Sequence, residues 1–187
     1  MIERIKLRLR GEGGTTIVEM LTVMIIMSIV FAGITSVFVA GSKAAADQDR
    51  RFQAQLASRL ALDKIRRDIH CANDVVTPFK TTEVTLKIST ACGGDVSWCT
   101  AAVTGYSNRY ALYRQLGTSC SSAGTKIADY LTGTSGAAPN IFPAFAHDVG
   151  CGCLASLQVD FAVSIKGTAV GAYELTDTIF LRNSTRI

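Results

Sequence analysis

The most informative segment of the chain runs from residue 11 to residue 32 and reads Gly-Glu-Gly-Gly-Thr-Thr-Ile-Val-Glu-Met-Leu-Thr-Val-Met-Ile-Ile-Met-Ser-Ile-Val-Phe-Ala. Between Thr15 and Ala40 the single ionisable side chain is Glu19. A carboxylate inside a membrane-spanning helix costs roughly 2.5–3.5 kcal/mol on insertion scales, so it is expected to be functional and to have a partner. The alternative is a signal anchor that carries an acid close to one membrane interface by accident.

The apolar run is long enough to span a membrane. Its uncharged part, Met20–Ala40, has 21 residues, and about 20 residues of helix cross a hydrocarbon core. A secretory signal has a shorter apolar region that ends at a small-residue cleavage site. The alanines at positions 44–46 could imitate such a site, which leaves ordinary signal cleavage as an alternative.

A basic leader precedes this run and predicts the orientation of the chain. Its cations outnumber its two acids, Glu3 and Glu12; the cations are Arg4, Lys6, Arg8 and Arg10. The positive-inside rule therefore places the N-terminus in the cytoplasm and everything after Ala40 outside it.

The basic leader, Gly14 and Glu19 together resemble the class III signal of type IV prepilins and pseudopilins. In that family a short basic leader ends in Gly, and the apolar helix after it carries Glu at its fifth residue. Here the leader would be residues 1–14, the junction Gly14/Thr15, and Glu19 the fifth mature residue. The resemblance implies cleavage after Gly14 and N-methylation of Thr15 by a prepilin peptidase, followed by filament assembly, in which Glu19 pairs with the terminal amine of a neighbouring subunit. The family usually has Phe or Met as its first mature residue, and this chain has Thr15.

Length, charge and composition narrow the function classes. The chain has 187 residues, and the part beyond a leader and a long helix is a head of roughly 110 residues, enough for one modest core. The net charge of +4 is too small to indicate nucleic-acid binding, and part of it lies in the leader. Aromatic residues make up 7% of the chain and do not alternate with a basic patch, so single-strand binding by stacking is not predicted.

Six cysteines follow the apolar run: Cys71, Cys92, Cys99, Cys120, Cys151 and Cys153. An even number in an extracytoplasmic head predicts disulfides. Zinc is the alternative, although Cys151-Gly-Cys153 lacks the C-x2-C spacing of ribbons and fingers. We expect Cys92 to pair with Cys99, and Cys71 to reach a loop near Cys151 or Cys153. Those last two are expected to have different partners, because a two-residue separation strains disulfide geometry.

The helix is expected to continue beyond the membrane and to end near Cys71–Asp74, before the Thr77-Pro78 break. Two apolar stripes lie on opposite sides of this continuation. One consists of Phe52, Leu56 and Leu60; the other consists of Ala54, Ala57, Ser58, Ala61, Leu62, Ile65 and Ile69. A surface helix needs one stripe, so two indicate that one packs on the head's own sheet and the other on neighbouring subunits. The alternative is a helix buried on both sides within one head.

The rest of the chain predicts a β-sheet. Period-2 alternation indicates half-buried antiparallel strands at 83–89, 109–115, 157–165 and 173–182. Loops are expected at 91–102, 117–124, 132–153 and 166–171. One long helix followed by strands is an α+β fold, which is the pilin-like layout that the resemblance implies.

No catalytic, metal or cofactor site is predicted. The two histidines, His70 and His147, have no motif-placed nucleophile, and His70 is assigned a capping or surface role. The glycines at 11–14 lack the Lys-Ser/Thr of a phosphate loop. Trp98, beside Cys99, is assigned to core or disulfide packing.

We therefore expect a non-enzymatic filament subunit in three parts: a leader (1–14), a transmembrane and assembly helix (15–41) and an extracytoplasmic pilin-like head (42–187). Within the superfamily the chain is similar to the minor pseudopilins of type II secretion, closest to the J class, at 62–69, 110–114 and 180–183. The resemblance implies as partners a prepilin peptidase, other pilin or pseudopilin subunits, an inner-membrane assembly platform and the membrane. The alternatives are a membrane-anchored extracytoplasmic binding module, and a DNA-uptake or adhesive minor pilin.

Overall fold

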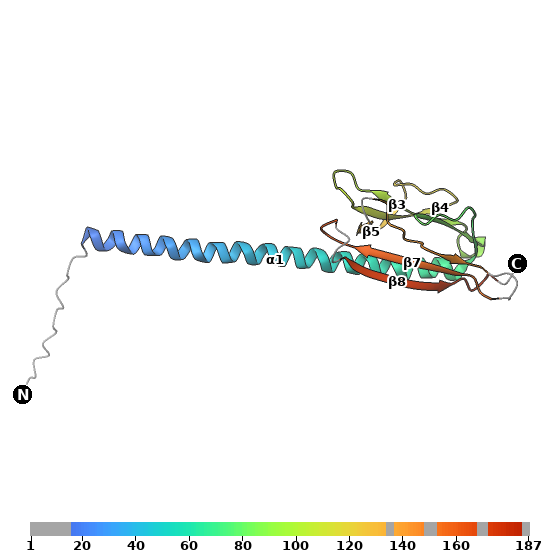
Figure 1. Cartoon of the computed structure of the whole chain (residues 1–187), viewed down its shortest axis with the longest axis horizontal. Helices are drawn as coiled ribbons and strands as arrows, with labels where there is room; N and C mark the ends of the chain where they lie inside the picture. Colours follow the sequence, from blue (N-terminus) through green and yellow to red (C-terminus); the bar gives the residue numbers. More distant parts are fainter. Residues whose placement is uncertain (1–15, 134–136, 148–152, 168–171, 185–187) are drawn as a thin grey trace, which may run out of the picture. The chain divides into compact units, whose positions relative to one another are not determined.

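The computed structural model describes residues 16–133, 137–147, 153–167 and 172–184. One long helix, α1 (Ile17–Cys71), is followed by an antiparallel β-sheet, so the predicted α+β fold is confirmed (Figure 1). The chain divides into two compact units, Met1–Asp47 and Gln48–Ile187. The first unit holds the N-terminal part of α1. The second holds its C-terminal part together with the sheet, and α1 ends within the predicted Cys71–Asp74 window.

The sheet is built from short antiparallel strands in the second unit. Among the described residues they are β1 (Ala72–Val75), β2 (Glu83–Ile88), β3 (Val96–Ala102), β4 (Tyr110–Leu116), β5 (Thr125–Leu131), β6 (Phe145–Ala146), β7 (Ser156–Val163) and β8 (Tyr173–Phe180). A short 3-10 helix, η1 (Thr90–Cys92), lies between β2 and β3. The order is β1-β2-β3-β4-β5-β7-β6, and β8 pairs with β7. The sheet is therefore a five-stranded meander that joins a C-terminal hairpin through a single pairing, Leu131 with Val163.

The four predicted strands exist, with bounds that differ by one or two residues from those expected. The loop predicted at 91–102 is wrong, because β3 occupies its second half. In β3, Val96 and Trp98 are buried in the core, while the Ser97 hydroxyl lies 2.8 Å from the Thr85 hydroxyl and 2.7 Å from the Gly117 carbonyl oxygen that it bonds. Small and polar residues concealed this alternation in the sequence. Strands β1, β5 and β6 were not predicted.

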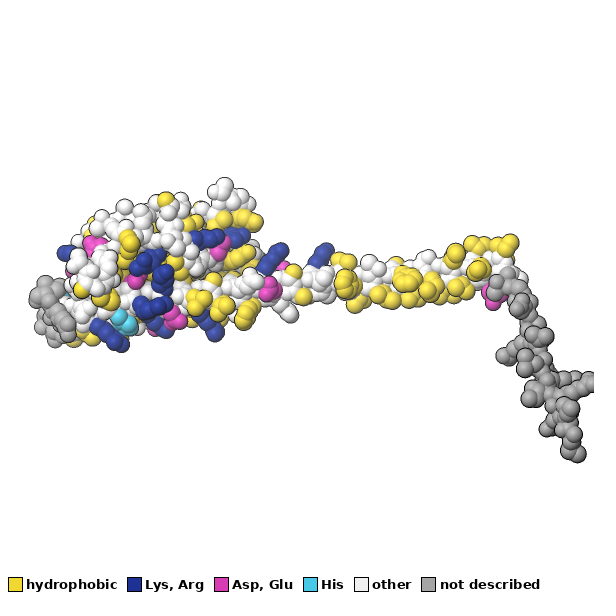
Figure 2. Space-filling view, turned by 180° about the vertical axis from the view of Figure 1, so that it is seen from behind, with side chains coloured by type: hydrophobic (Ala, Val, Ile, Leu, Met, Phe, Trp, Pro, Cys, Tyr) yellow, Lys and Arg dark blue, Asp and Glu magenta, His cyan; other side chains and the backbone are white. Residues whose placement is uncertain are grey.

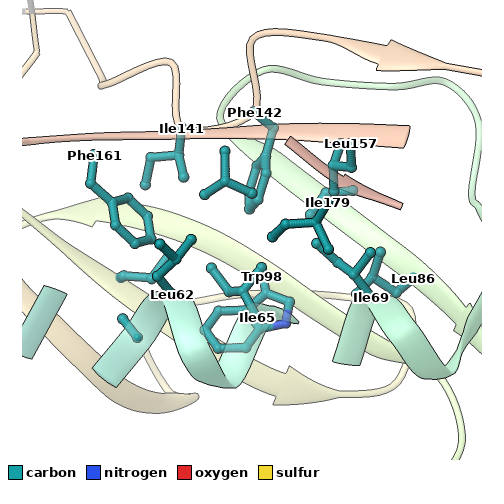
Figure 3. Packing of buried hydrophobic residues seen from close by; sticks show 14 of the residues in the cluster. Leu62, Ile65, Ile69, Leu86, Trp98, Ile141, Phe142, Leu157, Phe161 and Ile179 are labelled. Atoms are coloured by element: carbon teal, nitrogen blue, oxygen red, sulfur yellow. The ribbon is translucent and has the colours of Figure 1, made fainter. Parts of the chain in front are cut away.

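The C-terminal part of α1 packs on the sheet through the predicted stripe. Ala54, Ser58, Ala61, Leu62, Ile65 and Ile69 are buried. Figure 3 shows Leu62, Ile65 and Ile69 against Trp98, Phe161 and Ile179 from the strands. Full burial of one large apolar side chain stabilises a fold by roughly 1.5–3 kcal/mol. The small residues Ala54, Ser58 and Ala61 allow close approach, and the larger ones fill the core.

A polar cluster also attaches α1 to the sheet. The Asp68 carboxylate accepts two hydrogen bonds from the Arg114 guanidinium, at 2.8 and 3.2 Å, and one from the indole N–H of Trp98 at 3.0 Å. Arg114 lies on β4 and Trp98 on β3, so one helical carboxylate joins two strands. The Asp68 and Arg114 side chains are only 14% and 23% exposed, which places this ion pair where solvent screens it weakly.

The end of α1 is held by the C-terminal segment of the chain. The Asn183 amide donates hydrogen bonds to the carbonyls of His70 and Cys71, at 3.4 and 3.3 Å. The Nδ1 atom of His70 lies 3.1 Å from the carbonyl oxygen of Phe180. The two Asn183 bonds satisfy carbonyls that a helix end leaves without partners. The His70 side chain contacts a carbonyl of β8, so among the described residues it links α1 to that strand and does not cap the helix.

A second ion pair lies between β4 and β5. The Arg109 guanidinium donates to both carboxylate oxygens of Asp129, at 2.9 and 2.8 Å, and stacks on the rings of Tyr130 and Tyr106. Burial acts to raise the pKa of Asp129, but hydrogen bonds from Arg109, the Tyr130 amide and Lys126 outweigh it and lower that pKa from 3.8 to about 2.

We expect the Asp129→Asn variant to lose stability at neutral pH but not at about pH 2. The folded pKa of Asp129 lies below its unfolded value of about 3.9, so the stabilisation is present above pH 4 and is lost as the pH falls through about 2. It amounts to roughly 2.6 kcal/mol at most, and to less where solvent screens the pair. Urea unfolding followed by fluorescence of the single tryptophan, Trp98, measures it. A difference between the two proteins that stays constant from pH 7 to pH 2 would contradict the assignment.

Candidate functional site

The N-terminal part of α1 exposes an apolar surface along its length. Large apolar side chains from Ile17 to Val39 are 42–81% exposed, and none of this segment is covered in the described part of the chain (Figure 2). By length and composition this helix can cross a membrane. Exposed apolar patches of this extent mark contact with lipid or with other proteins.

The hydroxyl groups of this segment have hydrogen-bond partners within the helix itself. The hydroxyls of Thr22, Ser28, Thr35, Ser36 and Ser42 each donate to a backbone carbonyl three or four residues earlier, at 2.7–3.0 Å. Unsatisfied polar groups cost several kcal/mol in hydrocarbon, so the helix avoids that cost at all five positions. Ala32, Ser36 and Ala40 follow one another at four-residue spacing, a pattern that lets the backbones of two helices approach closely in a membrane.

Glu19 lies in the first turn of α1, three residues after Thr16. The backbone N–H of Glu19 donates to the Thr16 hydroxyl at 3.3 Å, which is half of a capping box. The other half, a bond from the Thr16 amide to the Glu19 carboxylate, is not among the bonds of the described residues. The sequence contained this Thr-x-x-Glu signal, and it explains where the helix begins. It leaves the carboxylate itself available.

No hydrogen bond or ion pair reaches the Glu19 carboxylate within the described part of the chain, and Thr16–Ser42 contains no basic side chain. A charged group in an apolar helix is stable in a membrane only with a partner. The helix N-terminus itself favours a negative charge, by roughly 0.3–1 kcal/mol, which is less than the insertion cost. Inside a membrane, a partner for Glu19 would therefore come from the chain's own terminus or from another molecule. Gly14 and Thr15, the predicted cleavage and methylation positions, lie outside the described residues.

A second exposed surface lies on α1 within the second unit. Phe52, Leu56 and Leu60 are 65%, 47% and 59% exposed, whereas the opposite stripe is buried in the core. The prediction that one stripe packs on the head's own sheet is thus confirmed, and within the described residues the helix is not buried on both sides. Packing of the other stripe on neighbouring subunits stays a prediction. We call Phe52, Leu56 and Leu60 the exposed stripe.

The cysteine pairing differs from the expected one. Cys99 forms a disulfide with Cys120, so the predicted Cys92–Cys99 bridge is wrong. The reason is strand register: Cys99 lies opposite Tyr113 on β4, and Cys120 follows β4 and lies against the Tyr113 carbonyl. Cys92 belongs to η1, on the other side of Gly93 and Gly94.

Cys71 is a free thiol, so its predicted bridge to the region of Cys151 and Cys153 is also wrong. The chain after α1 turns directly into β1, which pairs with β2 and directs Cys71 toward the β2–β3 connection. Cys153 is disulfide-bonded, and Cys151 lies outside the described residues.

Disulfide bonding removes Cys99, Cys120 and Cys153 from the thiolates that the zinc alternative requires. The described residues contain no group of three or more His, Cys, Asp or Glu side chains that could hold a metal.

The histidines do not form a catalytic pair in the described structure. His70 lies at the end of α1, and Nδ1 of His147 lies 3.7 Å from a carboxylate oxygen of Asp74. Trp98 is fully buried and bonded to Asp68, which confirms its assignment to the core.

Comparisons with family models, curated proteins and solved structures found no match to this chain.

Proposed function

We propose that this chain is a minor pilin or pseudopilin, a structural and non-enzymatic subunit of a type II secretion pseudopilus or of a type IV pilus-like filament. The observation that carries the proposal is the Glu19 carboxylate, which has no partner within the described residues of an uncovered, membrane-length helix. The α+β head with one of two helical stripes exposed supports the same function.

The proposed path begins with a single-pass precursor whose N-terminus is cytoplasmic and whose head is extracytoplasmic. A prepilin peptidase removes residues 1–14 and methylates the new α-amino group of Thr15. Methylation leaves that amine cationic, and in an assembled filament it pairs with Glu19 of a neighbouring subunit. Pairing two opposite charges offsets part of the cost of removing both from water.

The two exposed apolar surfaces then have distinct roles. Before assembly the N-terminal part of α1 lies in the inner membrane. During assembly the platform transfers it to the filament, where the same part of α1 of other pilin or pseudopilin subunits replaces lipid around it. The exposed stripe packs on those neighbours as well, because three large apolar side chains at four-residue spacing form a continuous ridge on a helix.

Substitution of Gly14 tests the processing step. We expect Gly14→Leu to leave most of the chain in the membrane as the full-length precursor, because glycine lets the backbone enter a narrow peptidase site and a branched side chain does not. Mass spectrometry of the membrane-extracted chain measures the fraction that is cleaved. Gly11→Leu, three residues earlier in the same leader, is the matched control and should be processed normally. Mature chain that begins at Thr15 in the Gly14 variant would show that Gly14 does not determine cleavage.

A further inference from the structure

Two cysteines without a disulfide lie side by side where α1 meets the sheet. Cys71 is the last residue of α1, and Ala72, the next residue, pairs with Ile88 at the end of β2. Cys92 closes η1, where its backbone N–H donates to the Ser89 carbonyl at 2.9 Å. This turn folds the chain back over the end of β2 and brings Cys92 next to Cys71.

Hydrogen bonding to the neighbouring Cys92 side chain is the largest cause that raises the pKa of the Cys71 thiol, and burial, the Cys92 thiol charge and the Asp68 carboxylate raise that pKa further. Cys71 is partly buried and Cys92 is exposed. In the described part of the chain these are the two cysteines that carry free thiols. The pair therefore consists of one accessible sulfur and one sheltered sulfur.

We propose that Cys71 and Cys92 form a reversible disulfide that fastens the end of α1 to the β2–β3 connection, and that the exposed Cys92 reacts with the oxidant first. The proposal rests on the proposed function only in placing the head in an extracytoplasmic, oxidising compartment.

The chemistry is two successive thiol–disulfide exchanges with a disulfide-bearing oxidant. The Cys92 thiolate attacks one sulfur of the oxidant, forms a mixed disulfide and releases the other sulfur as a thiolate. The Cys71 thiolate then attacks Sγ of Cys92 and displaces the remaining oxidant thiolate. The protein loses two thiol protons and two electrons, and the oxidant is reduced to two thiols. The raised pKa of Cys71 disfavours it as the first attacking group, and its burial restricts access to an external disulfide.

The bridge would add a covalent link where the fold now relies on hydrogen bonds. The Asn183 bonds and the Asp68 cluster hold the last turns of α1 to the hairpin and to β3 and β4. A Cys71–Cys92 bond would join the same turn to η1. Restricting the unfolded chain in this way raises the midpoint of thermal unfolding, by on the order of 10 °C for one bridge in a unit of this size.

The direct test uses the full-length chain, extracted from membranes in detergent, reduced, and then exposed to oxidised glutathione. After alkylation, cleavage by trypsin and by a protease that cuts before Asp isolates Cys71 in residues 68–73 and Cys92 in residues 88–94, apart from Cys99. We expect the two peptides to be recovered joined. Glutathione attached to both cysteines, without joined peptides, would overturn the proposal.

The order of attack is tested with a matched pair of variants. Cys71→Ser should accumulate a stable glutathione adduct on Cys92, because the resolving thiol is missing. Cys92→Ser should form an adduct on Cys71 at least roughly tenfold more slowly, since that thiol is sheltered. Equal rates in the two variants would contradict the assigned order. Thermal unfolding of both variants under reducing conditions shows whether each retains the fold.

The state of the chain taken directly from cells separates this inference from the proposed function. If the Cys99–Cys120 disulfide is reduced in the chain isolated from cells, the head is not in an oxidising compartment and the proposed function fails. That conclusion does not depend on whether oxidised glutathione joins Cys71 to Cys92 in vitro. If Cys99–Cys120 is oxidised but Cys71 and Cys92 never join in glutathione, the inference fails and the proposed function is unaffected.

Discussion

The Glu19→Ala variant should be inserted and cleaved normally, yet enter filaments at least about tenfold less than the unaltered chain. The expectation follows from the position of the carboxylate, which has no partner among the described residues and no basic side chain nearby in sequence. In the filament the variant would leave the terminal amine of a neighbouring subunit without its counter-charge. A buried charge without a partner costs several kcal/mol, and each 1.4 kcal/mol is a factor of ten. The measurement is the ratio of the chain in sheared filaments to the chain in membranes.

Two further variants separate charge from helix structure. Glu19→Gln keeps the size of the side chain but removes its charge, and we expect it to be as deficient as Glu19→Ala. Thr22→Ala removes the hydroxyl that bonds the Glu19 carbonyl within the same turn, at 2.9 Å, and leaves the charge in place; it should assemble normally. Normal assembly of Glu19→Ala would remove the main support for the proposed function.

The Asp68→Ala variant should destabilise the second unit by roughly 3 kcal/mol. Removal of the Asp68 carboxylate leaves the Arg114 guanidinium, whose side chain is 23% exposed, without its counter-charge. It also leaves the fully buried indole N–H of Trp98 without an acceptor. Such a loss lowers the midpoint of thermal unfolding by on the order of 10 °C for a unit of this size. Urea or thermal unfolding followed by Trp98 fluorescence measures it, and the emission of the folded state should change as well, because the indole loses its hydrogen bond.

Asp63→Ala is the matched control for Asp68. Asp63 lies one turn and a half earlier on the same helix and also pairs with an arginine, Arg66, at 3.1 Å, but its side chain is 58% exposed. Exposed pairs contribute roughly 0–1 kcal/mol, so this variant should unfold close to the unaltered protein. Equal losses for Asp63→Ala and Asp68→Ala would show that burial does not set the contribution of Asp68.

The helix and its faces could be predicted from the sequence because they depend on local, periodic information. The sequence has no Pro between Ser42 and Cys71, which predicted how far the helix continues. The spacing of the apolar and small residues from Ala54 to Ile69 predicted which face of the helix is buried. The strands β2 and β7 could be predicted for the same reason, since large apolar residues alternate along both of them.

The features that were missed depend on contacts between distant residues. Strand β3 owes its place to pairing with β2 and β4, and its Ser97, Cys99 and Thr100 do not form an apolar pattern that the sequence reveals. The Cys99–Cys120 disulfide follows from that pairing, so the partner of Cys99 could not be found without the register. The Asp68 cluster joins residues from α1, β3 and β4, and nothing in the spacing of Asp68, Trp98 and Arg114 indicated that they meet.

For the site, Glu19 could be identified from its isolation in an apolar run, but its relation to Thr16 came from the structure. The hydroxyl of Thr16 caps the helix through the Glu19 amide, so the first turn is held without the carboxylate. In a Thr-x-x-Glu sequence the Thr hydroxyl can cap the helix and the Glu carboxylate can bond back to the Thr amide. Here the hydroxyl caps the helix, so the carboxylate remains available for a partner outside the described residues.

The most direct test of the proposed function is the mass of the N-terminal peptide of the chain extracted from membranes. The proposal predicts that trypsin releases residues 15–43, beginning at Thr15 and carrying one methyl group on its α-amino nitrogen. A chain that still begins at Met1 would instead indicate a membrane-anchored binding module, and one that begins just after the alanines at 44–46 would indicate ordinary signal cleavage. Either of those two results would contradict the assignment of this chain as a filament subunit.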